Sequence, residues 1–419
     1  MENKDRVVQL CQDAKIASKS LALASEEQKN KALFAMAEHI MQHQSQIISA
    51  NTQDMSLAKQ KGLSGALLDR LWLDKKRIKA MAEGLKAIVK LPEPVDKILS
   101  HWQQPSGLKI SKVSVPIGVI AVIYESRPNV TADAAGLCLK SGNAVILRGG
   151  SESAYSSRAI LNCLKLGLEQ AGLPIHAIQM LPSQSRNMVT ELIQQDQYVD
   201  VIVPRGGKTL IKALTEKSRI PLFKHLEGLC HTYIHQDALV EKAVNIVLNA
   251  KMRRTGICGA TETLLIDRKV IKSHFPKIVE ALLDAGCEVR LDQILKGHYP
   301  SLPTATVEDW STEYLDGIIS VKVVENLEEA LAHINQYSSQ HTDAIVTEND
   351  DVVARFLTEV DSAIVMHNTS TQFADGGEFG MGAEIGISTG KLHARGPVGV
   401  EQLTTFKYQV RSEGAVRPA

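Results

Sequence analysis

Short apolar runs alternate with helix-length segments through the middle of this chain, and few folds satisfy such a pattern. The run IGVIAVIY at 117–124 has no charged residue, which is typical of a strand buried on both faces of a sheet. It is followed by VTADAAGLCLKSG, whose apolar spacing and closing glycine indicate a helix. Three similar apolar runs follow, each after a helix or turn: AVILR (144–148), AIQMLP and VDVIVP (199–204). Strands joined by crossover helices form a doubly wound parallel sheet, so we predict an α/β fold.

A second α/β set begins near residue 239. LVEKAVNIVLNAKMRR (239–254) predicts a helix, and ATETLLID predicts the strand after it. The later strand-like runs are CEVRLD, GIISVKVV, DAIVTE and SAIVMHN. Before both sets, the first residues have helical periodicity until LPEPVD at 91–96, where two prolines end it. Two isolated strand-like segments remain, LKISKVSV (108–115) and GVEQLTTFKYQVR near the C-terminus, and the glycine-rich segment after 368 suggests a loop folded over a cleft.

Composition excludes several classes of function. The 419 residues include 47 basic and 47 acidic side chains, so net charge gives no reason to expect a nucleic-acid or anionic-membrane partner. No apolar run has the length of a membrane helix, and the start lacks the apolar core of a signal peptide, so we expect a cytoplasmic protein. The cysteines show no CxxC or metal-ligand spacing, so we expect neither disulfides nor a metal site. Three of them fall on apolar helix faces and are expected to be structural: Cys11, Cys138 and Cys163.

Cys258 lies in a setting that suits chemistry. In MRRTGICGATETLL (252–265) it follows two arginines and stands beside glycines that leave room for a substrate. A thiol becomes a strong nucleophile when it loses its proton, and nearby cations favour the thiolate. The alternative is a buried structural cysteine, the usual role of this residue type, with the arginines at a solvated helix end.

Two strand ends suit a phosphate group. LRGGSES places Arg148 at a strand end, followed by two glycines and by Ser151 as the expected N-cap of a helix. PRGGKT repeats the arrangement of arginine, two glycines and a helix start, where backbone N–H groups favour an anion. Such turns also use glycine and serine for geometry alone, and the GxGxxG fingerprint is absent. The candidate cofactor-binding residues are Arg148, Gly149, Ser151, Arg205, Gly206, Gly207 and Lys208.

Several long motifs resemble one enzyme family. NVTADAAGLCLKSGNAVILRGG, PRGGKTLI, NAKMRRTGICGATETLL, NTSTQFADGGEFGMGAEIGIST and KLHARGPVGVEQLTTFKY are together similar to the γ-glutamyl phosphate reductases, a branch of the aldehyde dehydrogenase superfamily. The resemblance runs in order from about residue 5 to residue 411. It implies an aldehyde dehydrogenase-like fold, with a Rossmann-type cofactor domain, an α/β catalytic domain and a small β oligomerisation arm. The implied division is 1–105 for the helical start and cofactor-binding domain, 106–116 for an oligomerisation strand, 117–235 for the cofactor-binding domain, 236–367 for the catalytic domain, 368–397 for a return to the cofactor domain and a cleft loop, and 398–419 for an oligomerisation strand and tail.

The same resemblance implies an activity and a mechanism. The family reduces L-glutamate 5-phosphate with NADPH to L-glutamate 5-semialdehyde, the second step of proline synthesis from glutamate. Cys258 then corresponds to the nucleophile that carries a thioester, and Asn129 in ESRPN to the amide that holds the oxyanion, although a turn role after Pro128 is the alternative. Arg148 lies where a cation suits the 2′-phosphate of NADP. A homo-oligomer and a functional association with glutamate 5-kinase are also implied.

Substrate contacts follow from loop position only. Cations near the nucleophile would hold the departing phosphate, and polar groups in the glycine-rich loop would hold the amino-acid head. The candidates are Arg127, Arg205, Lys251 and Arg253 for the phosphate, and Ser370, Thr371, Asp375 and Glu378 for the head. Each of them could equally be an ordinary surface group.

The general base of the acid-forming relatives is missing. Those enzymes carry a glutamate in ELGGK, whereas this chain reads KHLEGLCHTYIHQDA, which puts His225 in the place of the base and Glu227 two residues later. Loss of the base favours phosphate over water as acyl partner, because hydrolysis would waste an activated substrate. Two other functions stay open: an acid-forming dehydrogenase that uses Glu227, and a scaffold protein without activity.

Overall fold

The computed structural model describes residues 2–63, 65–125, 127–183, 185–224 and 226–417, which form two compact units. Unit 1 comprises Met1–Lys224, Gly380–Gly386 and Val398–Ala419, and unit 2 comprises His225–Phe379 and Ile387–Pro397. In the described ranges no helix is both long enough and apolar enough to cross a membrane.

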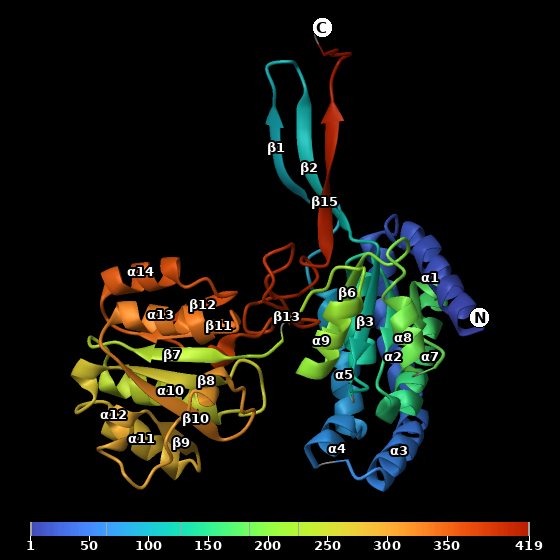
Figure 1. Ribbon diagram of the computed structural model, residues 1–419. Helices are drawn as coiled ribbons and strands as arrows, with labels where there is room; N and C mark the ends of the chain where they lie inside the picture. Colours follow the sequence, from blue (N-terminus) through green and yellow to red (C-terminus); the bar gives the residue numbers. More distant parts are fainter. Residues whose placement is uncertain (1, 64, 126, 184, 225, 418–419) are drawn as a thin grey trace. The chain divides into compact units, whose positions relative to one another are not determined.

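Unit 1 contains the predicted parallel sheet (Figure 1). Its strands lie in the order β5-β4-β3-β6, and the continuous apolar run forms β3, all six residues of which are buried. The chain proceeds from β3 outward to β5 and then returns to the other side of β3 as β6, so the order reverses between β3 and β6. Their bounds are Val119–Tyr124 (β3), Ala144–Arg148 (β4), Ile178–Met180 (β5) and Val201–Arg205 (β6). Ligands of such sheets bind beyond the carboxyl ends of the strands at this reversal.

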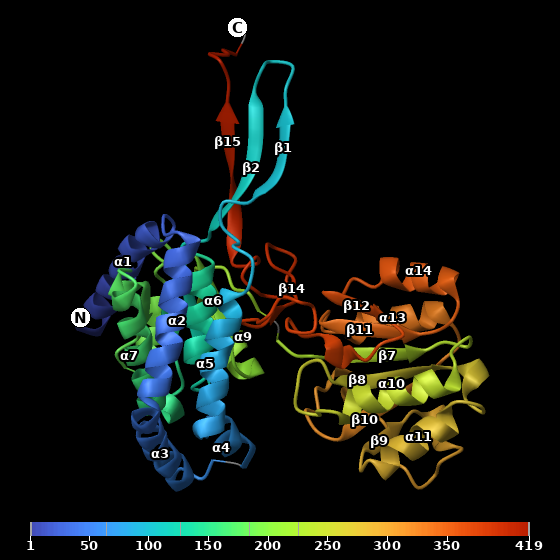
Figure 2. The same ribbon diagram turned by 180° about the vertical axis from the view of Figure 1, so that it is seen from behind.

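Nine described helices of unit 1 pack on or around this sheet (Figure 2). They are α1 (Glu2–Leu21), α2 (Glu26–Gln42), α3 (Gln44–Gln60), α4 (Gly65–Leu71), α5 (Lys75–Val89), α6 (Val130–Lys140), α7 (Ala154–Gln170), α8 (Arg186–Leu192) and α9 (Lys208–Lys217). α5 begins where the Asp74 carboxylate accepts the Arg77 N–H at 2.7 Å and ends just before the prolines of LPEPVD. Side-chain caps of this kind replace hydrogen bonds that the first helical turn lacks.

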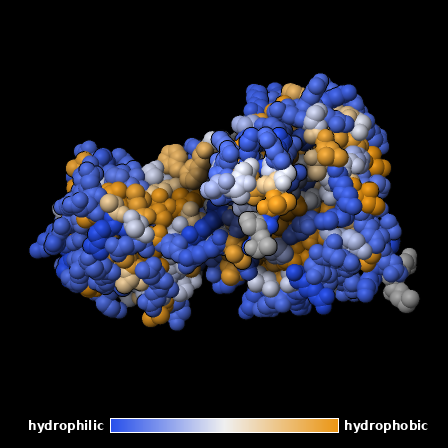
Figure 3. Space-filling view, turned by 90° about the horizontal axis from the view of Figure 1, so that it is seen from above, coloured by the Kyte–Doolittle hydropathy of each residue, from blue (hydrophilic) through white to orange (hydrophobic). Residues whose placement is uncertain are grey.

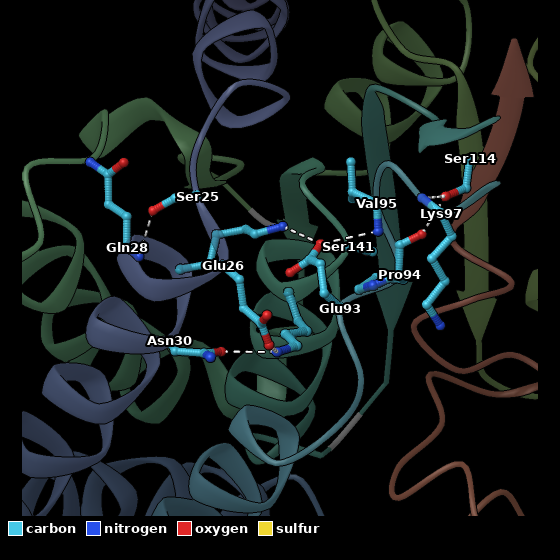
Figure 4. Close-up of polar contacts among 12 residues, drawn as sticks. Ser25, Glu26, Gln28, Asn30, Glu93, Pro94, Val95, Lys97, Ser114 and Ser141 are labelled. Atoms are coloured by element: carbon cyan, nitrogen blue, oxygen red, sulfur yellow. Dashed lines mark hydrogen bonds and ion pairs between the residues drawn. The ribbon is translucent and has the colours of Figure 1, made fainter.

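Two fully buried lysines join α2 to the segment after α5 and to α6, through partners that Figure 4 labels. The Lys29 ammonium donates to Glu93 at 2.6 Å, and Glu93 also accepts the Val95 N–H at 3.0 Å. Lys140 donates to Glu26 at 3.1 Å and to Asn30 at 3.0 Å. Buried charges need such partners, so this network fixes the chain where it leaves the helices.

A three-stranded antiparallel sheet extends from unit 1 and is called the arm (Figure 1). It consists of β1 (Ile98–Gln103), β2 (Lys109–Pro116) and β15 (Thr404–Arg411), with β2 in the centre. The sequence division places 98–105 in the cofactor domain, whereas in the structure most of this segment belongs to the arm, because β1 pairs with β2. All six residues of β1 are exposed, so its sequence shows no burial pattern that could have predicted it. Seen from above, the surface is mostly hydrophilic, with apolar side chains gathered in patches (Figure 3).

Unit 2 contains a six-stranded parallel sheet in the order β12-β11-β7-β8-β10-β9. The strands are β7 (Cys230–Ile234), β8 (Thr261–Asp267), β9 (Glu288–Leu291), β10 (Ile318–Val324), β11 (Thr342–Val346) and β12 (Ile364–His367). The helices are α10 (Val240–Met252), α11 (Phe275–Asp284), α12 (Gln293–Lys296), α13 (Leu327–Tyr337) and α14 (Asp350–Glu359), and a small hairpin joins β13 (Ile387–Ser388) to β14 (Gly396–Pro397).

The boundary between the units differs from the sequence division. The sequence predicts a boundary after residue 235, whereas the structure has it after Lys224, because β7 pairs with β8 and β11 inside unit 2. The segment up to Phe379 also stays in unit 2 rather than returning to unit 1.

Candidate active site

Cys258 is the one thiol that reaches solvent among the six cysteines, all of which lie in the described part of the chain. Burial raises the pKa of Cys11 to about 12 and the pKa of Cys163 and Cys287 to about 11, and it raises those of Cys138 and Cys230 as well. These five side chains stay protonated at neutral pH and are poor nucleophiles. Cys258 is half-exposed and lies at the amino end of β8, so it is presented by the loop before a strand and not by the carboxyl end of one.

The backbone of Cys258 rests on the segment that leads into β7. A Cβ atom at Gly228 would lie 2.1 Å from the Cys258 carbonyl oxygen and 2.6 Å from its Cα, so this position has no space for a side chain. The Gly228 N–H donates to Glu313 at 2.9 Å, and the Cys230 thiol donates to the Cys258 carbonyl oxygen at 3.1 Å. The backbone of Cys258 is therefore fixed by contacts with residues that the sequence did not single out.

Arg253 and Gln372 join the end of α10 to the short helical turn η5 (Thr371–Phe373). The exposed Arg253 donates to the Gln372 side-chain oxygen at 3.3 Å, and the Gln372 amide nitrogen donates to the carbonyl oxygen of Ala250 at 2.9 Å. Arg253 thus remains a candidate phosphate ligand in the segment that leads to Cys258. Lys251 does not, because its side chain is fully buried and its ammonium lies 2.5 Å from the Glu262 carboxylate.

The polar residues of the glycine-rich segment divide into buried and exposed ones. The Thr371 hydroxyl is fully buried 3.0 Å from the hydroxyl of Thr261, so its predicted contact with a substrate has no exposed group to make it. Ser370 is also buried, and its hydroxyl accepts the Gln372 N–H at 3.3 Å as the N-cap of η5. Asp375 is exposed and remains a candidate for the amino-acid head.

Asn129 lies in unit 1 just after β3, at the start of α6. Its side-chain nitrogen donates to the Asp133 carboxylate at 2.9 Å. Burial raises the pKa of Asp133 to about 6, although the bond from Asn129 and the charge of Arg205 lower it. Because β3 and β6 are neighbours, with Tyr124 opposite Arg205, the structure brings Asn129 and the PRGG turn to the same edge of the sheet.

A carboxylate of the same chain accepts a hydrogen bond from the start of α9. Gly207 is the N-cap of α9, and its N–H donates to a carboxylate oxygen of Glu125 at 3.0 Å. A Cβ at Gly207 would meet no atom within 4 Å, so the backbone is open to a ligand on that side. A backbone N–H at the start of a helix suits a phosphate oxygen, and Glu125 accepts this one in its place, so Gly207 fits the phosphates of a dinucleotide once the carboxylate moves away. Lys208, the first residue of α9, is exposed.

The other candidate cofactor loop differs in one detail from its prediction. Arg148 ends β4; burial lowers its pKa, while Glu152 and Glu125 raise it, so it remains a cation. Ser151, predicted as the helix N-cap, instead begins a short 3-10 turn, and its hydroxyl bonds to Glu152. The carboxylate of Asp54, from α3, caps α7 by accepting the Ser156 N–H at 2.8 Å.

The remaining site candidates are placed as follows. Arg127 is half-buried in the loop after β3, and Glu227 is half-buried beside Gly228. His225 lies outside the described residues.

Comparisons with known proteins agree on one family. Residues 1–293 match the model of the aldehyde dehydrogenase family. A γ-glutamyl phosphate reductase of Rhodospirillum rubrum is 59% identical over 97% of this chain and 95% of its own length, and one of Paramagnetospirillum magneticum is 57% identical over 98% and 97%. The crystal structure of the γ-glutamyl phosphate reductase of Thermotoga maritima superposes with a TM-score of 0.97 at 40% identity, covering 98% of this chain and all of that one.

Proposed function

This chain belongs to the γ-glutamyl phosphate reductases of the aldehyde dehydrogenase family, and from that membership we propose that it reduces L-glutamate 5-phosphate to L-glutamate 5-semialdehyde and phosphate with NADPH. The reaction is the second step of proline synthesis from glutamate, and we infer that it takes place in the cytoplasm. The observation that carries the chemistry is the half-exposed thiol of Cys258, since the five other cysteines are buried.

The nucleophile and the oxyanion donors follow from this proposal. The Cys258 thiolate attacks the γ-carbonyl carbon, a carbon–sulfur bond forms, and the carbonyl oxygen becomes an oxyanion. The side-chain N–H of Asn129 and the backbone N–H of Cys258 donate to this oxygen. The carbon–oxygen bond to phosphate then breaks, and phosphate leaves toward cations such as Arg253 and Arg127 while a thioester remains on Cys258.

Reduction completes the cycle. When bound, the nicotinamide cofactor supplies the hydride that reduces the thioester. Gly207 and its neighbours at the start of α9 would hold the phosphates, and Arg148 and Ser151 with Gly149 would hold the adenosine ribose, where a guanidinium suits a 2′-phosphate. The same Asn129 amide holds the oxygen a second time until the carbon–sulfur bond breaks and the aldehyde leaves.

The decisive experiment measures NADP reduction with glutamate semialdehyde, with and without inorganic phosphate. We expect turnover to require phosphate, to vanish in Cys258→Ala, and to persist in Cys163→Ala, which removes a buried thiol on α7. Turnover without phosphate would indicate an acid-forming dehydrogenase, and a fully active Cys258→Ala would refute the thioester.

We also propose that the arm makes the protein a homo-oligomer. β1 and β15 are edge strands of the arm, and Phe406, Tyr408 and Val410 of β15 are exposed. Unpaired edges with exposed apolar side chains favour association with another chain. Light scattering should show at least a dimer at micromolar concentration, and Tyr408→Asp should shift the mass toward the monomer; a monodisperse wild-type monomer would refute this.

A further inference from the structure

Asn129 and Asp133 are neighbours on one face of the start of α6, because four residues make about one helical turn. The 2.9 Å bond from Asn129 Nδ2 to Asp133 Oδ2 links them. Asn129 precedes the helix with φ −60° and ψ −30°, and its side chain caps no helix N–H group. The bond to Asp133 therefore fixes the side-chain amide relative to the helix.

The charge on Asp133 determines which end of that amide is presented outward. An asparagine amide has two ends of similar size, an NH2 group that donates and an oxygen that accepts. An ionised carboxylate can only accept, so it holds the NH2 end, and the second N–H of the same nitrogen stays available to another acceptor. A protonated Asp133 could instead donate to the Asn129 oxygen, which would let the amide turn over.

We propose that Asp133 is a positioning residue for the reaction: its carboxylate orients the Asn129 amide so that the second N–H donates to the acyl oxygen of the substrate. This inference rests on the proposed function, because it needs the oxyanion role of Asn129. The carboxylate also strengthens that donor, since a charge-assisted bond to one N–H polarises the nitrogen that carries the other.

The surroundings of Asp133 set the pH range of this effect. Arg205, at the end of β6, is the charged group that acts on Asp133 from a neighbouring element, and α5 approaches it at Gly84, which has no side chain. With its pKa raised to about 6 by burial, Asp133 is ionised at neutral pH and becomes protonated below about pH 6. The orientation of Asn129 is then lost progressively as the pH falls through this value.

The test compares Asp133→Asn, Asn129→Ala and the double variant in NADP reduction with glutamate semialdehyde and phosphate. At pH 8 we expect Asp133→Asn to lower kcat about tenfold or more, with the KM for NADP changed less than about twofold. In the Asn129→Ala background the same substitution should change kcat less than about twofold, because its effect passes through Asn129. The ratio of wild-type to Asp133→Asn kcat should fall toward one between pH 7 and pH 5, and taking the ratio cancels the titration of groups that both proteins share.

Two further variants serve as a control for the pH dependence and as a second way to remove the charge of Asp133. Asp200→Asn changes a carboxylate at the amino end of the sheet, where it accepts the Val119 N–H, and should leave the pH ratio flat. Asp133→Ser repeats the loss of charge if Asp133→Asn does not fold. An unchanged kcat in Asp133→Asn, or an equal loss with and without Asn129, would overturn the positioning role alone. An unchanged kcat in Asn129→Ala would refute the oxyanion role and the inference together.

Discussion

Gly228→Ala should inactivate the enzyme without unfolding it. The added methyl group would lie 2.1 Å from the Cys258 carbonyl oxygen and 2.6 Å from its Cα, whereas ordinary contacts of a Cβ begin near 3.4 Å. Both neighbours are backbone atoms, so no side chain can rotate away, and the two segments must separate by about 1 Å. A displacement of about 1 Å at a reacting group can reduce turnover about 100-fold, while overpacking costs about 1–3 kcal/mol of stability.

Two assays distinguish a displaced nucleophile from a damaged fold. Steady-state turnover should fall about 100-fold, and the rate at which iodoacetamide alkylates Cys258, followed by mass spectrometry, should change with it. Binding of NADPH, measured by its fluorescence, should stay within about twofold, because Gly228 belongs to unit 2. Gly256→Ala is the matched control in the same loop, since its Cβ would meet nothing closer than a carbonyl oxygen at 3.7 Å. Wild-type turnover in Gly228→Ala would refute the steric reasoning.

Three other predictions concern buried charge and the start of α9. Glu262→Leu leaves the buried Lys251 ammonium without its partner and should cost about 3–5 kcal/mol in calorimetry, most of which the double variant with Lys251→Met should recover; equal losses in both would contradict this. Burial lowers the pKa of His333 to about 2, so the folded protein binds fewer protons than the unfolded chain. The free energy of unfolding should therefore decrease as the pH is lowered from about 6.5, by up to about 1.4 kcal/mol per pH unit. His333→Phe should remove that slope in urea titrations at several pH values. Glu125→Gln should tighten NADPH binding about threefold to tenfold, because a carboxylate no longer competes for the Gly207 N–H; an unchanged or weaker Kd would oppose this.

The sheets were predictable where burial and apolarity coincide. β3 is fully buried and β4 is buried up to Arg148, and continuous apolar runs such as VIAVIY and AVIL identify such strands directly. β7 is equally buried but reads Cys-His-Thr-Tyr-Ile, so periodicity missed it. Its polar side chains are satisfied inside the fold: His231 bonds to Asp343 at 2.9 Å, and Thr232 bonds to Thr261 at 2.8 Å. A strand whose polar groups find internal partners has no apolar signature, and the domain boundary was misplaced for that reason.

The sequence pointed to candidate reacting groups but not to the residues that support them. The Cys258 loop, Asn129 and the PRGG turn carry local signals, because nucleophiles, amides and helix N-termini are recognisable from a few consecutive residues. The cap of α7 comes from Asp54, far away in the sequence, so the serine in LRGGSES gave a false signal. Contacts between distant segments have no local pattern, and a single sequence does not contain them.

The position of Glu227 keeps one alternative function open to a direct test. Gly228 lies against the backbone of Cys258, and consecutive Cα atoms are about 3.8 Å apart, so Glu227 starts close to the nucleophile. A general base needs only one water between itself and the thioester, and proximity alone therefore does not exclude hydrolysis. If phosphate is the true acyl partner, Glu227→Gln should keep phosphate-dependent turnover within about threefold, because no step of that route removes a proton from water. Wild-type NADP reduction without phosphate that disappears in Glu227→Gln would show instead that this carboxylate activates water and that the chain makes a free acid.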